Sequence, residues 1–140
     1  LESGAGLDLG GLAKGWMADR LAERLGANAL ANLGGDLCAH GAGPAGEGWP
    51  VDFAGVTVML REQGAATSST RKRAWQMGVQ RVHHLIDPRT GAPAQSDLTQ
   101  VSVVATSAVR AEVFAKAALM LGAAAAPPYL AARCQAWWLG

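Results

Sequence analysis

The chain has 140 residues, of which half are apolar, and its formal net charge is +1. This length suffices for one domain with a real core, and the near-neutral charge without a basic stripe argues against a nucleic-acid or membrane-surface protein. The longest apolar run, residues 113–121, is interrupted by Lys116 and is too short to span a bilayer.

The start of the sequence and its cysteines say little about a cellular compartment. There is no initiating Met and no signal peptide, and the first motif follows almost at once. We therefore expect one domain over residues 1–140 that is incomplete at its N-terminus. Cys38 and Cys134 are far apart and lack metal-binding spacing, which favours two buried thiols and leaves a single disulfide as the alternative.

The first part of the chain predicts one helix followed by short strands. A short apolar run ends at Gly10 and Gly11, and residues 12–25 then have the apolar spacing of an amphipathic helix, with Gly26 placed to cap it. Two strands are expected at residues 28–33 and 37–39, joined by a turn at 34–36. A glycine-rich loop at 41–48 then leads to a predicted hairpin of strands 51–53 and 56–60, and a further strand is expected at 63–67.

The second part combines strands with two further helices. Ser107 can N-cap a helix over residues 108–121 that Gly122 ends, and residues 99–105 have the clearest strand pattern. The other expected elements are a strand at 79–86 closed by a turn at 87–91, a short helix at 127–133 and a last strand at 135–139. This order predicts an α+β fold with a largely antiparallel sheet and helices packed on one face.

Gly10, Gly11 and Lys14 have the residue types of a phosphate-binding turn. Paired glycines let a backbone approach a ligand closely, and the first turn of a helix offers unpaired N–H groups and a partial positive charge. Lys14 would add a full charge. The same residues also suit an ordinary strand-to-helix turn with a solvated lysine, and this stretch alone favours that structural alternative.

Histidine and hydroxyl side chains mark two further candidate positions. His84 lies late in a predicted strand, where it can face a site, and because His83 precedes it one of the two must face the other way. The hydroxyl groups of residues 68–70 form a predicted turn that can hold a carbonyl-rich ring or a phosphate. A purely structural role is the alternative at both positions.

Glu112 and Lys116 are the only charged side chains between residues 111 and 121. Their i,i+4 spacing allows an ion pair, which contributes about 0.3–0.5 kcal/mol when exposed. Charges in such an apolar stretch can also be site groups on one face of the helix. The sequence shows neither a Ser/His/Asp nucleophile arrangement nor a Cys/His metal spacing.

Four strings in this order resemble a known family. They are DLGGLAKG at residues 8–15, NLGGD at 32–36, ATS at 66–68 and HLIDPRTG at 84–91. Together they resemble the ApbE family of flavin transferases, the FAD:protein FMN transferases. The resemblance runs over nearly the whole chain and corresponds to the second half or so of a usual member. Family members are often exported or tethered to a membrane, so localisation stays open.

The resemblance implies a T-fold-like α+β domain that binds FAD. Family members split the FAD pyrophosphate with a divalent metal, normally magnesium, and attach FMN through a phosphoester bond to a threonine of a target flavoprotein, releasing AMP. Phosphoryl transfer depends mainly on positioning and charge neutralisation, which is consistent with the missing triad. FAD, Mg²⁺ and a target flavoprotein are thus expected, and a homodimer is a further expectation.

The resemblance also implies roles for individual residues. Glu112 and Lys116 take the catalytic positions, and Glu112 and the main-chain carbonyl of Ala13 are the candidate metal ligands. Residues 87, 88 and 91 are expected to shape the last loop. The residues expected to contact the cofactor are Gly10, Gly11, Lys14, Asn32, Gly34, Gly35, Thr67, Ser68, His84, Ile86 and Thr90.

Three departures from the family pattern affect these roles. Members usually carry an Asp and a Thr as metal ligands where this chain has Glu112 and Lys116. Glu can ligate magnesium, whereas a protonated lysine has no lone pair, so we expect the Lys116 ammonium to neutralise phosphate charge near the usual metal position. Ser69 replaces a usual Gly. The N-terminal half of a usual member is absent from the sequence, and because both halves contribute to the family's FAD site, an incomplete pocket is expected. The alternatives are a non-catalytic FAD-binding protein and an inactive truncated member.

Overall fold

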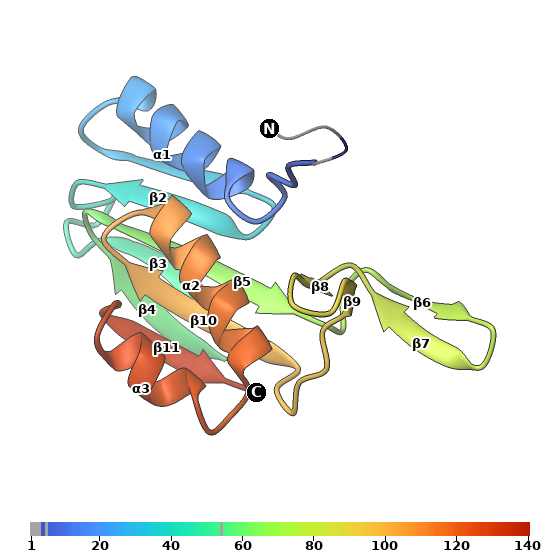
Figure 1. Ribbon diagram of the computed structural model, residues 1–140. Coiled ribbons are helices and arrows are strands. Elements are labelled where there is room, and N and C mark those ends of the chain that lie inside the picture. The colour runs from blue at the N-terminus through green and yellow to red at the C-terminus, as the bar shows by residue number, and fades with distance from the viewer. Residues whose placement is uncertain (1–3, 5, 54) are drawn as a thin grey trace.

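A five-stranded antiparallel sheet forms the centre of the molecule (Figure 1). The computed structural model describes residues 4, 6–53 and 55–140. Neighbouring strands pair antiparallel throughout the sheet, in the spatial order β1-β2-β5-β10-β11. The strands are β1 (Ala29–Leu33), β2 (Asp36–His40), β5 (Gln63–Ser69), β10 (Gln100–Ala105) and β11 (Ala136–Leu139).

The helices pack on one face of this sheet (Figure 1). Helix α1 (Ala13–Leu25) lies over β1 and β2, α2 (Ala108–Leu121) lies over β5 and β10, and the short α3 (Ala126–Ala131) packs against α2. The period-2 alternation of β10 directs Val101 and Val103 into the core beneath Ala115 and Leu119 of α2. The predicted α+β architecture with helices on one face is confirmed.

Two glycines allow α2 to lie against its neighbours. A Cβ atom built at Gly15 would lie 2.6 Å from the main-chain oxygen of Ala108, so α1 and α2 cross at backbone contact. A Cβ atom at Gly64 of β5 would overlap the backbone of Ala108. Small residues at these crossings bring the first turn of α1 close to α2, which is the arrangement that the site depends on.

A hairpin of β3 (Trp49–Phe53) and β4 (Val56–Leu60) covers the opposite face of the sheet. Phe53 and Leu60 are buried there, and the ring of Phe53 stacks on Trp138 at a centroid distance of 5.3 Å. This hairpin was predicted; its turn includes Ala54, which lies outside the described residues. The sheet residues that pack under the hairpin are Leu37, Ala39, Ala65 and Val104.

The single strand predicted at residues 79–86 is wrong. The chain instead forms β7 (Gln80–His83), interrupts the strand at the next two residues, and then forms the two-residue β8 (Ile86–Asp87), which pairs with β9 (Ala92–Pro93). Strand β7 pairs with β6 (Ala74–Met77), which was not predicted. The β6–β7 hairpin projects away from the body (Figure 1), and because Trp75 and Met77 are both exposed, no core-facing alternation marks β6 in the sequence.

Most other boundaries agree with the sequence. Helix α2 has the predicted bounds, the Ser107 hydroxyl accepts a hydrogen bond from the Arg110 N–H at 3.4 Å, and Gly26 and Gly122 end their helices. The hydroxyl-rich turn predicted at residues 68–70 is wrong for Ser68 and Ser69. These two residues belong to β5, because pairing with β10 extends that strand through Ser69.

The two cysteines form no disulfide with each other. Cys38 is buried on β2. This burial is the main reason that the pKa of its thiol is raised to about 12, and nearby carboxylates contribute to the rise. A thiol with that pKa is protonated and unreactive at neutral pH. Among the described residues, no helix is both long and apolar enough to cross a membrane.

Candidate functional site

A cleft of about 690 Å³ opens at one end of the sheet, where β1 and β5 end and β2 and β10 begin. It extends from the helix face around the sheet end to the β3–β4 hairpin. The predicted site residues that line it are Gly10, Lys14, Asn32, Gly34, Gly35, Thr67, Ser68, His84, Glu112 and Lys116. The fold thus brings together residues that lie up to about a hundred positions apart in the sequence.

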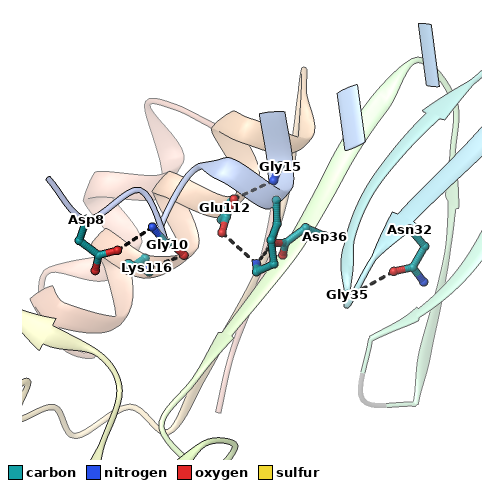
Figure 2. A network of polar contacts seen from close by, with 9 residues as sticks. Asp8, Gly10, Gly15, Asn32, Gly35, Asp36, Glu112 and Lys116 are labelled. Atoms are coloured by element: carbon teal, nitrogen blue, oxygen red, sulfur yellow. Dashed lines mark hydrogen bonds and ion pairs between the residues drawn. The ribbon is translucent and has the colours of Figure 1, made fainter. Parts of the chain in front are cut away.

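The β1–β2 turn forms a fixed backbone edge of the cleft. Leu33 pairs with Asp36, so Gly34 and Gly35 make a two-residue hairpin loop with φ values of 67° and 100°. Such a loop needs positive φ at both positions, which glycine adopts without strain. The Asn32 side-chain oxygen accepts the Gly35 N–H at 2.9 Å and holds the turn in this shape (Figure 2).

Lys14 lies between two buried carboxylates. Asp36 and Glu112 are each 3% exposed. The Lys14 ammonium forms ion pairs with Asp36 and with Glu112 Oε1, the latter at 2.9 Å, while Glu112 Oε2 accepts the Gly15 N–H at 2.8 Å. Figure 2 shows Glu112 reaching from α2 toward Gly15. This network joins α1, α2 and β2, and both oxygens of Glu112 are engaged in it.

Burial and mutual repulsion set the protonation of this network. Desolvation, followed by the nearby Glu112 charge, raises the pKa of Asp36, although Lys14 opposes the shift. Desolvation lowers the pKa of Lys14, but its hydrogen bonds and ion pairs with Asp36 and Glu112 outweigh that effect and raise it. Lys14 therefore stays charged at neutral pH, and two carboxylates already compensate its charge.

Lys116 lies across the loop that precedes α1. Its ammonium donates to the main-chain oxygen of Gly10 at 3.2 Å, and a Cβ atom at Gly11 would lie 2.6 Å from Nζ. Figure 2 shows this contact together with the hydrogen bond from the Gly10 N–H to Asp8. The ion pair predicted between Glu112 and Lys116 is wrong, because Glu112 points to Lys14 and Lys116 points to the loop.

The two neighbouring histidines face different surroundings, as predicted. His84 lines the cleft, whereas the ring of His83 hydrogen-bonds the Ala94 carbonyl at 2.9 Å. Desolvation and the positive charges of Arg73 and Lys116 lower the pKa of His84. Its imidazole is therefore neutral at neutral pH and retains a lone pair that can accept a proton or hydrogen bond.

Some predicted site residues lie outside the cleft lining. Ile86 belongs to β8, and Thr90 lies in the turn after it. Gly11 lies in the loop before α1, next to the Lys116 side chain, and Ala13 is the first residue of α1. Asp87 accepts hydrogen bonds from Arg89, which lower its pKa and fix the turn that was expected to shape this loop.

Sequence reasoning missed several lining residues. Asp36 is part of the string at residues 32–36 and of the predicted turn, but it was not expected as a site residue, and the structure shows it lining the cleft in an ion pair with Lys14. Lys72 and Arg73 were recognisable as a positive cluster, but only the fold places them at the cleft. Ser102 lines it from β10 and shares a hydrogen bond of 2.8 Å with Thr67. Residues 50–53 of the β3–β4 hairpin also line it.

Comparison with known proteins agrees with the four strings. The family model described as ApbE family matches residues 1–138. The chain belongs to the ApbE family. A FAD:protein FMN transferase of Treponema pallidum is 32% identical over 142 residues, and one of Klebsiella pneumoniae is 32% identical over 130; each alignment covers 86% of this chain.

Solved ApbE structures have the same fold as this ApbE-family chain. The apo crystal structure of the flavinyl transferase ApbE from Pseudomonas stutzeri and that of an ApbE protein from Thermotoga maritima each have a TM-score of 0.74 and 28% identity, and cover 88% and 85% of this chain. The chain spans 39–40% of the two curated relatives and 42% of each solved chain, about two fifths of their length.

The donors at the cleft do not fit the magnesium ion that the ApbE resemblance implies. Both oxygens of Glu112 already accept hydrogen bonds, and one turn further along α2 the position of a usual ligand carries an ammonium group. In the described part of the chain, no group of three or more His, Cys, Asp or Glu residues is arranged to hold a metal. A lysine without a lone pair cannot complete such a set.

Proposed function

We propose that this chain binds FAD in the cleft and contributes the cofactor site of an FAD:protein FMN transferase. The observation that carries the proposal is that all four matching strings supply residues to the lining of one cleft. The first string does so from the loop before α1 and its first turn, the second from the β1–β2 turn, the third from β5, and the fourth through His84. The names of the curated relatives support the same activity. The roles of the individual lining residues are part of this proposal.

In the proposed reaction, the hydroxyl oxygen of a target threonine bonds to the phosphorus of the FMN half of FAD. The bond from that phosphorus to the bridging oxygen breaks, AMP leaves, and the hydroxyl proton passes to a base. Lys72, Arg73 and Lys116 would neutralise phosphate charge, and the neutral imidazole of His84, which lines the cleft, would accept the proton. No step of this reaction uses magnesium, because the donor groups at the cleft do not fit that ion.

Incubation with FAD and a separate flavoprotein domain that carries an acceptor threonine tests the proposal. We expect AMP release together with a mass increase of the acceptor by one FMN phosphoester. The acceptor with Thr replaced by Ala is the matched control and should gain no mass. FAD binding without AMP release would support the non-catalytic alternative, and a lack of FAD binding would contradict the proposal.

A further inference from the structure

We propose that Lys116 is a built-in cation of the cleft that holds the phosphate groups of the bound ligand and makes a divalent metal unnecessary for binding. This inference rests on the proposed function for the identity of the ligand, which is FAD. It deepens that function by naming the charge on which phosphate binding depends.

The position of Lys116 fits an anion-binding group. The side chain is half-buried, lines the cleft and spends one of its three N–H donors on the Gly10 carbonyl at 3.2 Å. In residues 4, 6–53 and 55–140, no carboxylate lies within ion-pair distance of its ammonium. Its charge and its other donors are therefore available to a ligand.

Lys14 cannot take this role, although it lines the same cleft. Its ammonium is already shared by Asp36 and Glu112, both of which are buried. A phosphate that approached Lys14 would also approach two carboxylates, and like charges repel strongly where water is excluded. Of the two lysines that reach the cleft from the helix face, only Lys116 offers uncompensated positive charge.

The loop before α1 is shaped to hold this ammonium. The Lys116 ammonium occupies the space beside Gly11, because a Cβ atom built there would lie 2.6 Å from Nζ and would displace the end of the lysine side chain. The Gly10 carbonyl accepts one N–H of the ammonium at 3.2 Å, and the Asp8 carboxylate accepts the Gly10 N–H at 2.7 Å within the same loop. The loop therefore positions Lys116 before a ligand arrives, which lowers the entropy cost of binding.

The same geometry disfavours a divalent cation beside the phosphates. A metal near Glu112 would compete with Lys14 and with the Gly15 N–H for its oxygens, and it would meet the positive charge of Lys116. The ammonium already neutralises anionic charge at this place. Ligand affinity should therefore depend on Lys116 and be insensitive to Mg²⁺.

Titration of the purified chain with FAD, followed by flavin fluorescence, tests both expectations. We expect the parent to bind FAD with the same Kd, within about twofold, in EDTA and in millimolar MgCl₂. Lys116→Met keeps a side chain of similar length without the charge and should weaken binding about 10- to 100-fold in both buffers, the loss expected for one charge-assisted hydrogen bond to phosphate. Lys116→Arg should keep most of the affinity.

Arg110→Met is the matched control, because Arg110 is an exposed cation on the same helix that does not line the cleft. It should bind FAD as the parent does, and circular dichroism should show that all variants are folded. The inference is overturned if the parent binds FAD only with Mg²⁺, if Lys116→Met binds as tightly as the parent, or if Lys116→Arg binds as weakly as Lys116→Met.

A failure of the proposed function would look different. If the parent binds no FAD in either buffer, the ligand assignment is wrong, and titration with inorganic pyrophosphate by calorimetry then tests Lys116 alone. Pyrophosphate binding by the parent that Lys116→Met weakens at least tenfold would support the anion site. Equal binding by both proteins, or no binding by the parent, would overturn it.

Discussion

At the residue scale, Glu112 joins three elements through one carboxylate. It comes from α2, accepts the Gly15 N–H in the first turn of α1 and shares Lys14 with Asp36 of β2. A buried carboxylate is tolerated only when it is paired and hydrogen-bonded, and here both oxygens are. The role expected for Glu112 as a metal ligand would compete with this structural role.

The burial of Asp36, together with its repulsion by Glu112, predicts a pH-dependent stability. The pKa of Asp36 is higher in the folded protein than in the unfolded chain. The contribution of Asp36 to the free energy of unfolding is therefore fully present below its unfolded pKa and is lost as pH rises through its folded pKa. The substitution Glu112→Gln removes the negative charge next to Asp36 and so lowers the pKa of Asp36 in the folded protein. We expect the loss of unfolding free energy between about pH 4 and pH 7 to be smaller in Glu112→Gln than in the parent.

Urea unfolding across this pH range measures the difference. Glu23→Gln is the control, since Glu23 is an exposed partner of Arg20 on α1, and its profile should follow that of the parent. Parallel profiles for Glu112→Gln and the parent would contradict the coupling between the two buried carboxylates.

At the scale of elements, the contact between α1 and α2 decides the geometry of the site. Gly15 lets the first turn of α1 reach the backbone of α2, which brings Lys14 to Glu112 and places the loop before α1 beside Lys116. The sequence showed this glycine only as part of a string. Its role as a spacer between two helices follows from their crossing.

Gly15→Ala is therefore expected to lower the unfolding free energy. The new methyl group would lie 2.6 Å from the Ala108 oxygen, so the helices must separate at a cost of about 1–3 kcal/mol. Gly6→Ala provides a matched control because a Cβ atom there meets nothing within 4 Å, and its effect should stay within about 0.5 kcal/mol. Denaturant unfolding checks both, and equal stabilities would show that α1 shifts without cost.

At the scale of the whole molecule, apolar side chains remain exposed beside a sheet edge. Met17, Leu21 and Leu25 of α1 are 54%, 40% and 59% exposed and follow at i,i+4 spacing. The described residues give β1 a single strand neighbour, β2, so its other edge is unpaired. Exposed apolar ridges and unpaired strand edges both favour association.

We therefore predict that the chain self-associates through α1 and β1, in line with the expected homodimer. Leu21→Lys should shift the sedimentation coefficient toward that of a monomer at micromolar concentration, because it places a charge within the apolar ridge. Val79→Lys changes an almost fully exposed residue at the tip of the distant β6–β7 hairpin and should leave association unchanged. A parent that is monomeric at every concentration would contradict this prediction.

The sequence by itself determined the helices, most strands of the sheet and the family. Periodic apolar spacing, the Ser107 cap and the terminal glycines are local signals, and they depend on neighbours within a few residues. For the same reason it indicated Gly34 and Gly35 as a special turn. It missed β6, whose side chains pack on no core, and it merged β7 and β8 into one strand.

Only the tertiary structure decided which charges face which partners. The i,i+4 spacing of Glu112 and Lys116 predicted a local pair, but contacts with residues about a hundred positions away determined both partners. Burial of Asp36 and Glu112 made Lys14 an internal counter-ion, because desolvated carboxylates require one. That compensation leaves Lys116 as the helix-face lysine with charge available to a ligand, a distinction that no local pattern in the sequence contains.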